Sequence, residues 1–216
     1  MTEEKTKTLK KVKESLKYQF IDSTAITAVV TPIFALFETN IAGISDENSI
    51  NARLLSTGLN YIGIGRLFSK GLDISRKLFN INPKTSEKLR QLHDASYSVT
   101  WCGITQPPFY YAAGVRDLKE IAIGTVVGMG LALVVGGPIG YTIDAFRDLI
   151  GLKECERKSY PNLIKRQGSK TKKGLVALVT ASAIGITAGI YALTPNKQSF
   201  NYPHPASQIV ETQILK

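Results

Sequence analysis

A few charged side chains stand inside long apolar stretches of this 216-residue chain, and their types could support chemistry. Asp22, Glu38 and Arg66 are examples. A charge inside a membrane-spanning helix costs about 3 kcal/mol or more unless it has a partner, so such residues mark ion and proton pathways. A carboxylate that takes up and releases a proton is the chemistry that they predict.

Two ion pairs are expected among these charges. Glu38 lies about four turns after Asp22, and Arg53 opens the next apolar stretch at the same end. The two could pair, or they could be separate charges at the membrane surface. Arg66 lies deeper and needs a carboxylate, for which there are three candidates: Asp22, Asp94 and Asp144.

Amide side chains and prolines fall near the middle of three apolar stretches. Asn60 lies about two turns into the second stretch, and Gln106 is near the midpoint of the third, followed by Pro107 and Pro108. Pro32 lies at a similar depth in the first. Proline disrupts a helix, and interrupted helices at a membrane midplane free backbone groups that can hold a substrate. These residues indicate a binding site, with simple helix kinks as the alternative.

Five apolar stretches carry these residues, and each is about 20 residues long, the length of a helix that crosses a bilayer. They cover residues 22–43, 53–72, 94–115, 119–143 and 174–193. Charged segments separate them, which favours membrane spans over five buried helices of a water-soluble protein. The sequence therefore predicts an all-α integral membrane helical bundle.

The basic residues are distributed unevenly between the two predicted sides of this bundle. Six lysines precede the first stretch, six Lys and Arg residues lie from Lys70 to Arg90, and nine lie from Arg147 to Lys173. The 44–52 loop has none. The positive-inside rule then predicts a multi-pass membrane protein with a cytoplasmic N-terminus. The net charge of +10 is thereby explained without a nucleic-acid partner.

These spans divide the chain into segments. Residues 1–20 are basic and carry Leu9, Val12, Leu16 and Phe20 at helical spacing, which fits an amphipathic helix on the membrane surface or a solvated charged arm. Four spans lie within residues 21–150, and the fifth is 174–193. Residues 151–173 are then a basic cytoplasmic linker, and residues 194–216 an external tail.

Small residues recur at every fourth position of the fourth stretch: Gly124, Gly128, Ala132, Gly136 and Gly140. Lipid offers no hydrophobic drive for helices to associate, and a face of small residues lets two helix backbones approach closely enough to pack. The stripe therefore predicts packing against another helix. That helix belongs either to the same chain or to a second copy in a homodimer.

Two motifs indicate an internal repeat. DISRKLF begins at Asp73 and DAFRDLI at Asp144, 71 residues apart, and both read Asp-x-x-Arg-x-Leu. Asp22 and Asp94, near the starts of the first and third stretches, are 72 apart. Two helix pairs in the same orientation would explain these spacings, as in transporters built from parallel repeats. Coincidence among common residues at membrane boundaries is the alternative.

Motifs for other classes of protein are missing. The sequence has no HExxH, no GxSxG and no phosphate-binding loop, so no enzyme activity and no cofactor are expected. His93 and His204 are far apart, which speaks against a metal site. Cys102 and Cys155 have no CxxC spacing, so a disulfide framework is not expected.

Many of these residues resemble the L-alanine exporter (AlaE-like) family of small, four-helix inner-membrane transporters. The resemblance covers about residues 20–150 and is carried by several groups: Asp22-Ser23, Glu38, Gly43, Glu47, Ser49 and Arg53, then Asn60, Gly65-Arg66-x-Phe68, Gln106-x-Pro108-x-Tyr110, Gly136-x-x-x-Gly140-Tyr141 and Asp144-x-x-Arg147. Leu67 stands where the family usually has proline, and the fifth helix lies outside the family pattern.

The resemblance implies a protein of the plasma (inner) membrane with four family-like transmembrane helices, to which this sequence adds a fifth. It also implies a secondary-active exporter of a small amino acid similar to L-alanine, and the buried carboxylates would couple this export to protons. Substrate would contact Asn60, Gln106, Pro108 and Tyr110. Proton and charge coupling would involve Asp22, Glu38, Arg53, Arg66, Asp144 and Arg147. Membrane lipid and the amino acid are the expected partners. The alternative is a non-transporting membrane assembly or scaffold protein that uses the glycine stripe for association.

Overall fold

A computed structural model describes residues 3–40, 46–112 and 116–194, and all the regular structure in these ranges is helical. The elements are α1 (Glu3–Asn40), α2 (Asp46–Leu59), a π-helical turn η1 (Asn60–Ile64), α3 (Gly65–Leu78), α4 (Glu87–Ala112), α5 (Leu118–Leu149), α6 (Asn162–Lys165) and α7 (Ser169–Leu193). The predicted all-α class is confirmed.

Three of the described helices are long and apolar enough to cross a membrane. The candidate spans are Lys5–Phe37 of α1, Ile121–Leu149 of α5 and Ser169–Leu193 of α7. The predicted second span is divided between α2 and α3, of 14 residues each, and the third lies in α4, where Ser, Thr and Gln dilute the apolar residues. The predicted count of five spans is therefore not reached by length and composition alone.

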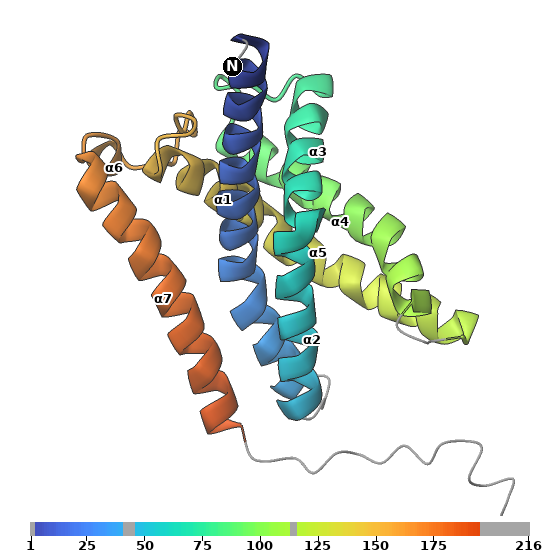
Figure 1. Cartoon of the computed structure of the whole chain (residues 1–216). Helices are drawn as coiled ribbons and strands as arrows, with labels where there is room; N and C mark the ends of the chain where they lie inside the picture. Colours follow the sequence, from blue (N-terminus) through green and yellow to red (C-terminus); the bar gives the residue numbers. More distant parts are fainter. Residues whose placement is uncertain (1–2, 41–45, 113–115, 195–216) are drawn as a thin grey trace, which may run out of the picture.

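Helix α1 is unbroken from Glu3 to Asn40, about 57 Å at 1.5 Å per residue. Residues 5–17 of α1 are exposed and continue the same helix (Figure 1). The basic N-terminal segment is therefore the first part of α1 and not a separate helix. The surface helix and the solvated arm both stay predictions.

The helix break predicted near the prolines lies elsewhere. α1 continues through Pro32, and α4 continues through Pro107 and Pro108 to Ala112. The break occurs at η1, where Gly63 has φ 157° and ψ −21°, a backbone conformation that side chains with a Cβ rarely adopt. A π-helical turn releases backbone carbonyls from the regular ladder, and such turns are frequent at functional sites.

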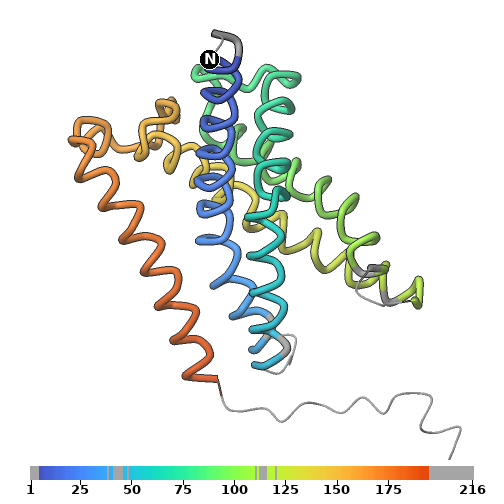
Figure 2. The backbone as a smooth tube through the Cα atoms, in the orientation of Figure 1, coloured from blue at the N-terminus to red at the C-terminus, as the bar shows by residue number. Residues whose placement is uncertain are grey.

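The helices form two pairs with α7 at one side (Figures 1 and 2). α1 lies beside α2 and α3, and α4 lies beside α5. The N-terminus of α1, the α3–α4 connection and α6 lie at the same end of the molecule, which we call the charged end, and the two pairs diverge away from it (Figure 1). The largest core cluster joins the pairs near this end through Ile21, Phe68, Leu72, Ile143 and Phe146.

Candidate functional site

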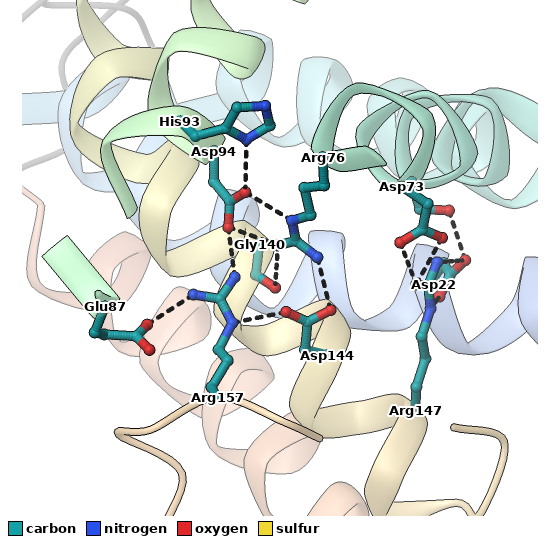
Figure 3. A network of polar contacts seen from close by, with 11 residues as sticks. Asp22, Asp73, Arg76, Glu87, His93, Asp94, Gly140, Asp144, Arg147 and Arg157 are labelled. Carbon is teal, nitrogen blue, oxygen red and sulfur yellow. Dashed lines mark hydrogen bonds and ion pairs between the residues drawn. The ribbon is translucent and has the colours of Figure 1, made fainter. Parts of the chain in front are cut away.

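A network of buried arginines and carboxylates joins the two helix pairs at the charged end (Figure 3). Arg147 of α5 is 1% exposed and bonds carboxylates of the other pair. Its Nε and Nη2 donate to Asp22 Oδ1 and Oδ2 at 2.7 and 2.8 Å. Its Nη1 donates to Asp73 Oδ2 at 2.8 Å. Arg147 is therefore saturated by two carboxylates that come from α1 and α3.

Arg76 of α3 makes the same set of contacts in the opposite direction. Its Nε and Nη2 donate to Asp94 Oδ1 and Oδ2 at 2.8 and 2.6 Å. Its Nη1 donates to Asp144 Oδ1 at 2.8 Å. In both halves, Nε and Nη2 bind one aspartate, which is Asp22 or Asp94. In both halves, Nη1 binds the aspartate of an Asp-x-x-Arg motif. Each helix pair supplies the arginine that neutralises the other pair's carboxylates.

Close backbone approaches repeat at the same spacing. A Cβ on Gly65 would lie 3.1 Å from the Ser23 Cα, and a Cβ on Gly136 would lie 2.7 Å from the Ala95 Cα. Gly65 and Gly136 are 71 residues apart, and Ser23 and Ala95 are 72 apart, as in the two motifs. Ion pairs and helix contacts in the first helix pair therefore have equivalents 71 or 72 residues later in the second, as expected for the predicted repeat.

Further donors distinguish the two halves of the network. Asp22 also accepts from Arg66 Nη1 at 2.8 Å and from Ser69 Oγ at 2.5 Å. The position equivalent to Ser69 is Gly140, where a Cβ would collide with the Asp94 carboxylate. The lack of a side chain there leaves Asp94 accessible to Arg157, the second arginine on that carboxylate.

Arg157 comes from the basic linker and is almost fully buried, with 1% of its surface exposed. It bonds Asp94, donates from Nε to Asp144 Oδ2 at 2.7 Å and from Nη1 to Glu87 Oε1 at 2.8 Å. Burial alone would lower the pKa of this guanidinium, but Asp144 and Asp94 outweigh it and hold the pKa above the usual range. Arg157 is therefore a permanent positive charge within the network.

The linker around Arg157 is docked on α5. The Tyr160 hydroxyl donates to Asp148 Oδ2 at 2.9 Å, and Lys172 Nζ donates to the same oxygen at 2.9 Å. Burial, with the bond to Asp148, raises the pKa of Tyr160. Cys155 is buried beside it, and burial raises the pKa of its thiol. The predicted linker thus begins as a packed segment, and it covers the network from the charged end.

The π-helical turn is attached to α1 just beyond the network. The Gln19 amide donates to the carbonyls of Asn60 and Tyr61 at 2.9 and 3.0 Å. The Ser23 hydroxyl donates to the Asn60 carbonyl at 2.7 Å. The carbonyls released by the turn therefore find donors on α1, which stabilises the break beside Asp22.

The predicted coupling residues are mostly brought together. Asp22, Arg66, Asp144 and Arg147 all belong to the network, and Arg66 pairs with Asp22 from among its three candidates. Arg53 lies elsewhere, with its guanidinium carbon 4.8 Å from the centre of the Phe34 ring. The side chain of Glu38 lies outside the described residues, so the expected Glu38–Arg53 pair stays a prediction.

The predicted substrate residues are not gathered in one place by any described contact. Asn60 is bound to α1, whereas the Gln106 amide packs on α5, where a Cβ on Gly128 would meet it. Among the described residues the buried Gln106 Oε1 has no hydrogen-bond partner. Pro108 lies within the unbroken α4, and the side chain of Tyr110 is outside the described residues.

A cavity of about 440 Å³ lies between α1, α2, η1 and α7. Its polar lining residues are Arg53, Tyr61, Tyr191 and six threonines, Thr24, Thr27, Thr31, Thr57, Thr180 and Thr187. Thr24, Thr180 and Thr187 donate to carbonyls four residues earlier in their helices. The buried Thr27 hydroxyl has no such partner in the described part of the chain. One cation and one unpaired hydroxyl in a largely apolar wall are features of small-molecule pockets.

The glycine stripe packs α5 against α4 of the same chain. Gly128 faces Gln106, Gly136 faces Ala95 and Ser98, and Gly140 faces Asp94. Ala132 is also buried, and Gly124 continues the stripe on α5. At these three glycines the stripe is therefore occupied within one chain rather than presented to a second copy.

Sequence reasoning missed several members of the network as site residues. These are Asp73, Glu87, Arg76, Asp94 in its role beside Arg76, and Arg157. Arg76 and Asp94 were visible in the repeated motifs, because a motif that places Arg147 on Asp22 places Arg76 on Asp94. Arg157 lies in a run of exposed basic residues, and nothing in that run distinguishes it.

The described residues include no group of three or more His, Cys, Asp or Glu side chains that could hold a metal ion. The sequence matches no family model, and it matches no curated protein and no solved structure.

Proposed function

We propose that the chain is a secondary-active, proton-coupled exporter of a small amino acid similar to L-alanine. The observation that carries the proposal is the exchange of ion pairs between two repeated helix pairs, which joins them at the charged end only. Transporters built from repeats work by moving one repeat against the other around a central site. A joint made of ion pairs suits such a movement, because a change of protonation can open it.

The proposed topology has five spans, with α2–η1–α3 and α4 crossing beside α1 and α5. The charged end faces the cytoplasm, as the distribution of Lys and Arg predicts. Ser96, Thr100 and Thr105 of α4 donate to carbonyls of their own helix, and the freed carbonyls at η1 accept bonds from α1. Irregular backbone is tolerated at membrane depth where its polar groups are satisfied in this way. The joined state would be closed toward the cytoplasm.

Asp22 is the proposed coupling carboxylate within the network. Protonation of Asp22 removes its charge and weakens its bonds to Arg147 and Arg66, which loosens the joint between the pairs. Asp94 holds the equivalent place on Arg76. Glu38, near the other end of α1, is the second candidate for proton exchange, on the side that faces away from the cytoplasm in this topology.

The cavity between α1, α2 and α7 is the proposed substrate compartment. Arg53 would attract the carboxylate of an amino acid, the Thr27 hydroxyl would bind its polar groups, and threonine methyl groups would contact a short apolar side chain. The cavity lies close to Asp22 along α1, since Thr24, two residues further on, lines it. Asn60 and Gln106 remain candidates for contacts made after the helix pairs move.

The test is transport by the purified full chain in proteoliposomes, with labelled L-alanine inside and an imposed proton gradient. Wild type should export alanine with the gradient and should also exchange labelled for unlabelled alanine without it. Asp22→Asn should lose the response to the gradient and retain exchange. Glu154→Gln removes an exposed carboxylate outside the network and should behave as wild type.

Two outcomes would contradict the proposal. Gradient-driven export by Asp22→Asn at the wild-type rate would exclude Asp22 as the coupling residue. No movement of alanine, or of other small amino acids, by wild type would favour the membrane assembly protein. That alternative has less support in the structure, because Gly128, Gly136 and Gly140 pack within the chain.

A further inference from the structure

A second hollow of the surface lies at the charged end and contains no residue of the ion-pair network, although Ile21 in its wall directly precedes Asp22. It is a groove of about 540 Å³ between the start of α1, the segment after α5 and the start of α7. Its charged lining residues are Lys13, Lys17 and Lys173, and its apolar ones are Leu16, Phe20, Ile21, Ile150 and Leu152. The Tyr18 hydroxyl donates to the Leu152 carbonyl at 3.1 Å and so ties two of the walls together.

The charges of this groove have one sign only. Its lining contains no carboxylate, and within the described part of the chain none of the three lysines makes an ion pair. Lys13 and Lys17 are one turn apart on α1, a spacing at which like charges repel and destabilise the helix. An anion bound between Lys13, Lys17 and Lys173 would relieve that repulsion.

The groove also exposes large apolar side chains beside the lysines. Leu16 is 62% exposed and Phe20 is 60% exposed, although both belong to the apolar stripe at the start of α1. The helix packing in the chain leaves this part of the stripe uncovered. A ligand that fits the groove must therefore offer an anionic group and a hydrocarbon part side by side.

The position of the groove identifies the source of such a ligand. The apolar stretches 22–43 and 174–193 begin beside the groove, next to its lining residues Ile21 and Lys173, and the stretch 119–143 of α5 ends about two turns before Ile150. In a bilayer the groove therefore lies at the level of the phospholipid headgroups. Basic pockets between helices at this level are typical sites for anionic headgroups.

We infer that this groove binds an anionic phospholipid of the surrounding bilayer. Lys13, Lys17 and Lys173 bind the headgroup phosphate, and Leu16 and Phe20 contact the first part of the acyl chains. The stems of the lysines lie along the same apolar surface, as they commonly do at membrane interfaces. The site does not depend on transport activity, and it links α1 to the fifth span through a lipid.

Native mass spectrometry of the purified full chain in detergent tests this site. Phosphatidylglycerol and phosphatidylcholine with identical acyl chains are titrated separately. Wild type should bind one phosphatidylglycerol about tenfold more tightly than phosphatidylcholine. The variant K13Q/K17Q/K173Q should lose affinity for phosphatidylglycerol on the order of a hundredfold, since each lysine contributes to the attraction.

A matched control separates the site from the general basicity of the chain. K5Q/K7Q/K170Q removes three exposed lysines from the same two helices without touching the groove, and it should retain wild-type affinity. Equal losses in the two triple variants, or equal binding of the two lipids by wild type, would overturn the inference. Displacement of the lipid by inorganic phosphate at equal concentration would do the same, because the groove would then hold phosphate alone.

Discussion

Replacing Asp22 by asparagine tests the ion-pair network most directly. Asp22 is fully buried and accepts two bonds from Arg147 at 2.7 and 2.8 Å, one from Arg66 at 2.8 Å and one from Ser69 at 2.5 Å. Asparagine keeps the shape but removes the charge and one acceptor oxygen. Arg147 then retains only Asp73 as a charged partner, while Arg66, which is 25% exposed, can turn to solvent.

The expected cost is set by the buried arginine that loses its partner. Removing one member of a buried ion pair destabilises a protein by about 3–5 kcal/mol. For a chain of this size, each kcal/mol lowers the melting temperature by about 2–4 °C. Asp22→Asn should therefore melt about 6–20 °C below wild type. Because Arg76 and Asp94 repeat the geometry, Asp94→Asn should show a similar loss.

The measurement is thermal unfolding of the purified variants in one detergent, followed by circular dichroism. The double variant Asp22→Asn/Arg147→Gln should be more stable than the sum of the single losses predicts, because it leaves no unpaired arginine. Glu154→Gln should melt within about 2 °C of wild type, as surface substitutions commonly do. Additive losses for Asp22 and Arg147, or an Asp22→Asn variant as stable as wild type, would refute the reasoning.

Two further predictions concern packing. Gly136→Ala should lower stability by about 1–3 kcal/mol, because its Cβ would lie 2.7 Å from the Ala95 Cα. Gly130→Ala on the same helix meets no atom within 4 Å and should raise stability by up to about 1 kcal/mol. Equal shifts of the two variants in thermal unfolding would contradict the α4–α5 contact. Cys155 in the folded chain should react with N-ethylmaleimide at least about tenfold more slowly than the exposed cysteine of Glu154→Cys, because burial raises the pKa of the Cys155 thiol and restricts access to it. Mass spectrometry of the alkylated protein measures both rates, and similar rates would show that the linker is not docked.

The sequence was sufficient to predict most of the helical framework. Apolar stretches of membrane-spanning length mark α1, α5 and α7 because their composition alone requires burial or lipid. The break at η1 could not be located, because it depends on Gln19 and Ser23 of another helix donating hydrogen bonds to the freed carbonyls. The prolines of α4 were a misleading signal, since the helix continues through Pro107 and Pro108 to Ala112.

The site was predictable where a motif was repeated. The two Asp-x-x-Arg motifs supply residues to both halves of the network. Their spacing does not reveal that each arginine binds carboxylates of the other helix pair. That exchange depends on how the two helix pairs pack together. Asp73 and Arg76 lie on one helix, yet Asp73 binds Arg147 and Arg76 binds Asp94. The glycine stripe predicted close packing correctly, and only the structure identifies α4 as the helix that it meets.

The exchange of arginines has a consequence for how the protein is made. The first helix pair leaves the ribosome before the second, and at that stage Arg76 has neither Asp94 nor Asp144 to neutralise it. Its own Asp73 likewise awaits Arg147, and Asp22 has only Arg66 as a charged partner. The ion pairs between the halves therefore form only when one half docks on the other. A chain divided in the α3–α4 connection would carry complementary unmatched charges on its two fragments, which would direct them to reassemble when they are produced together.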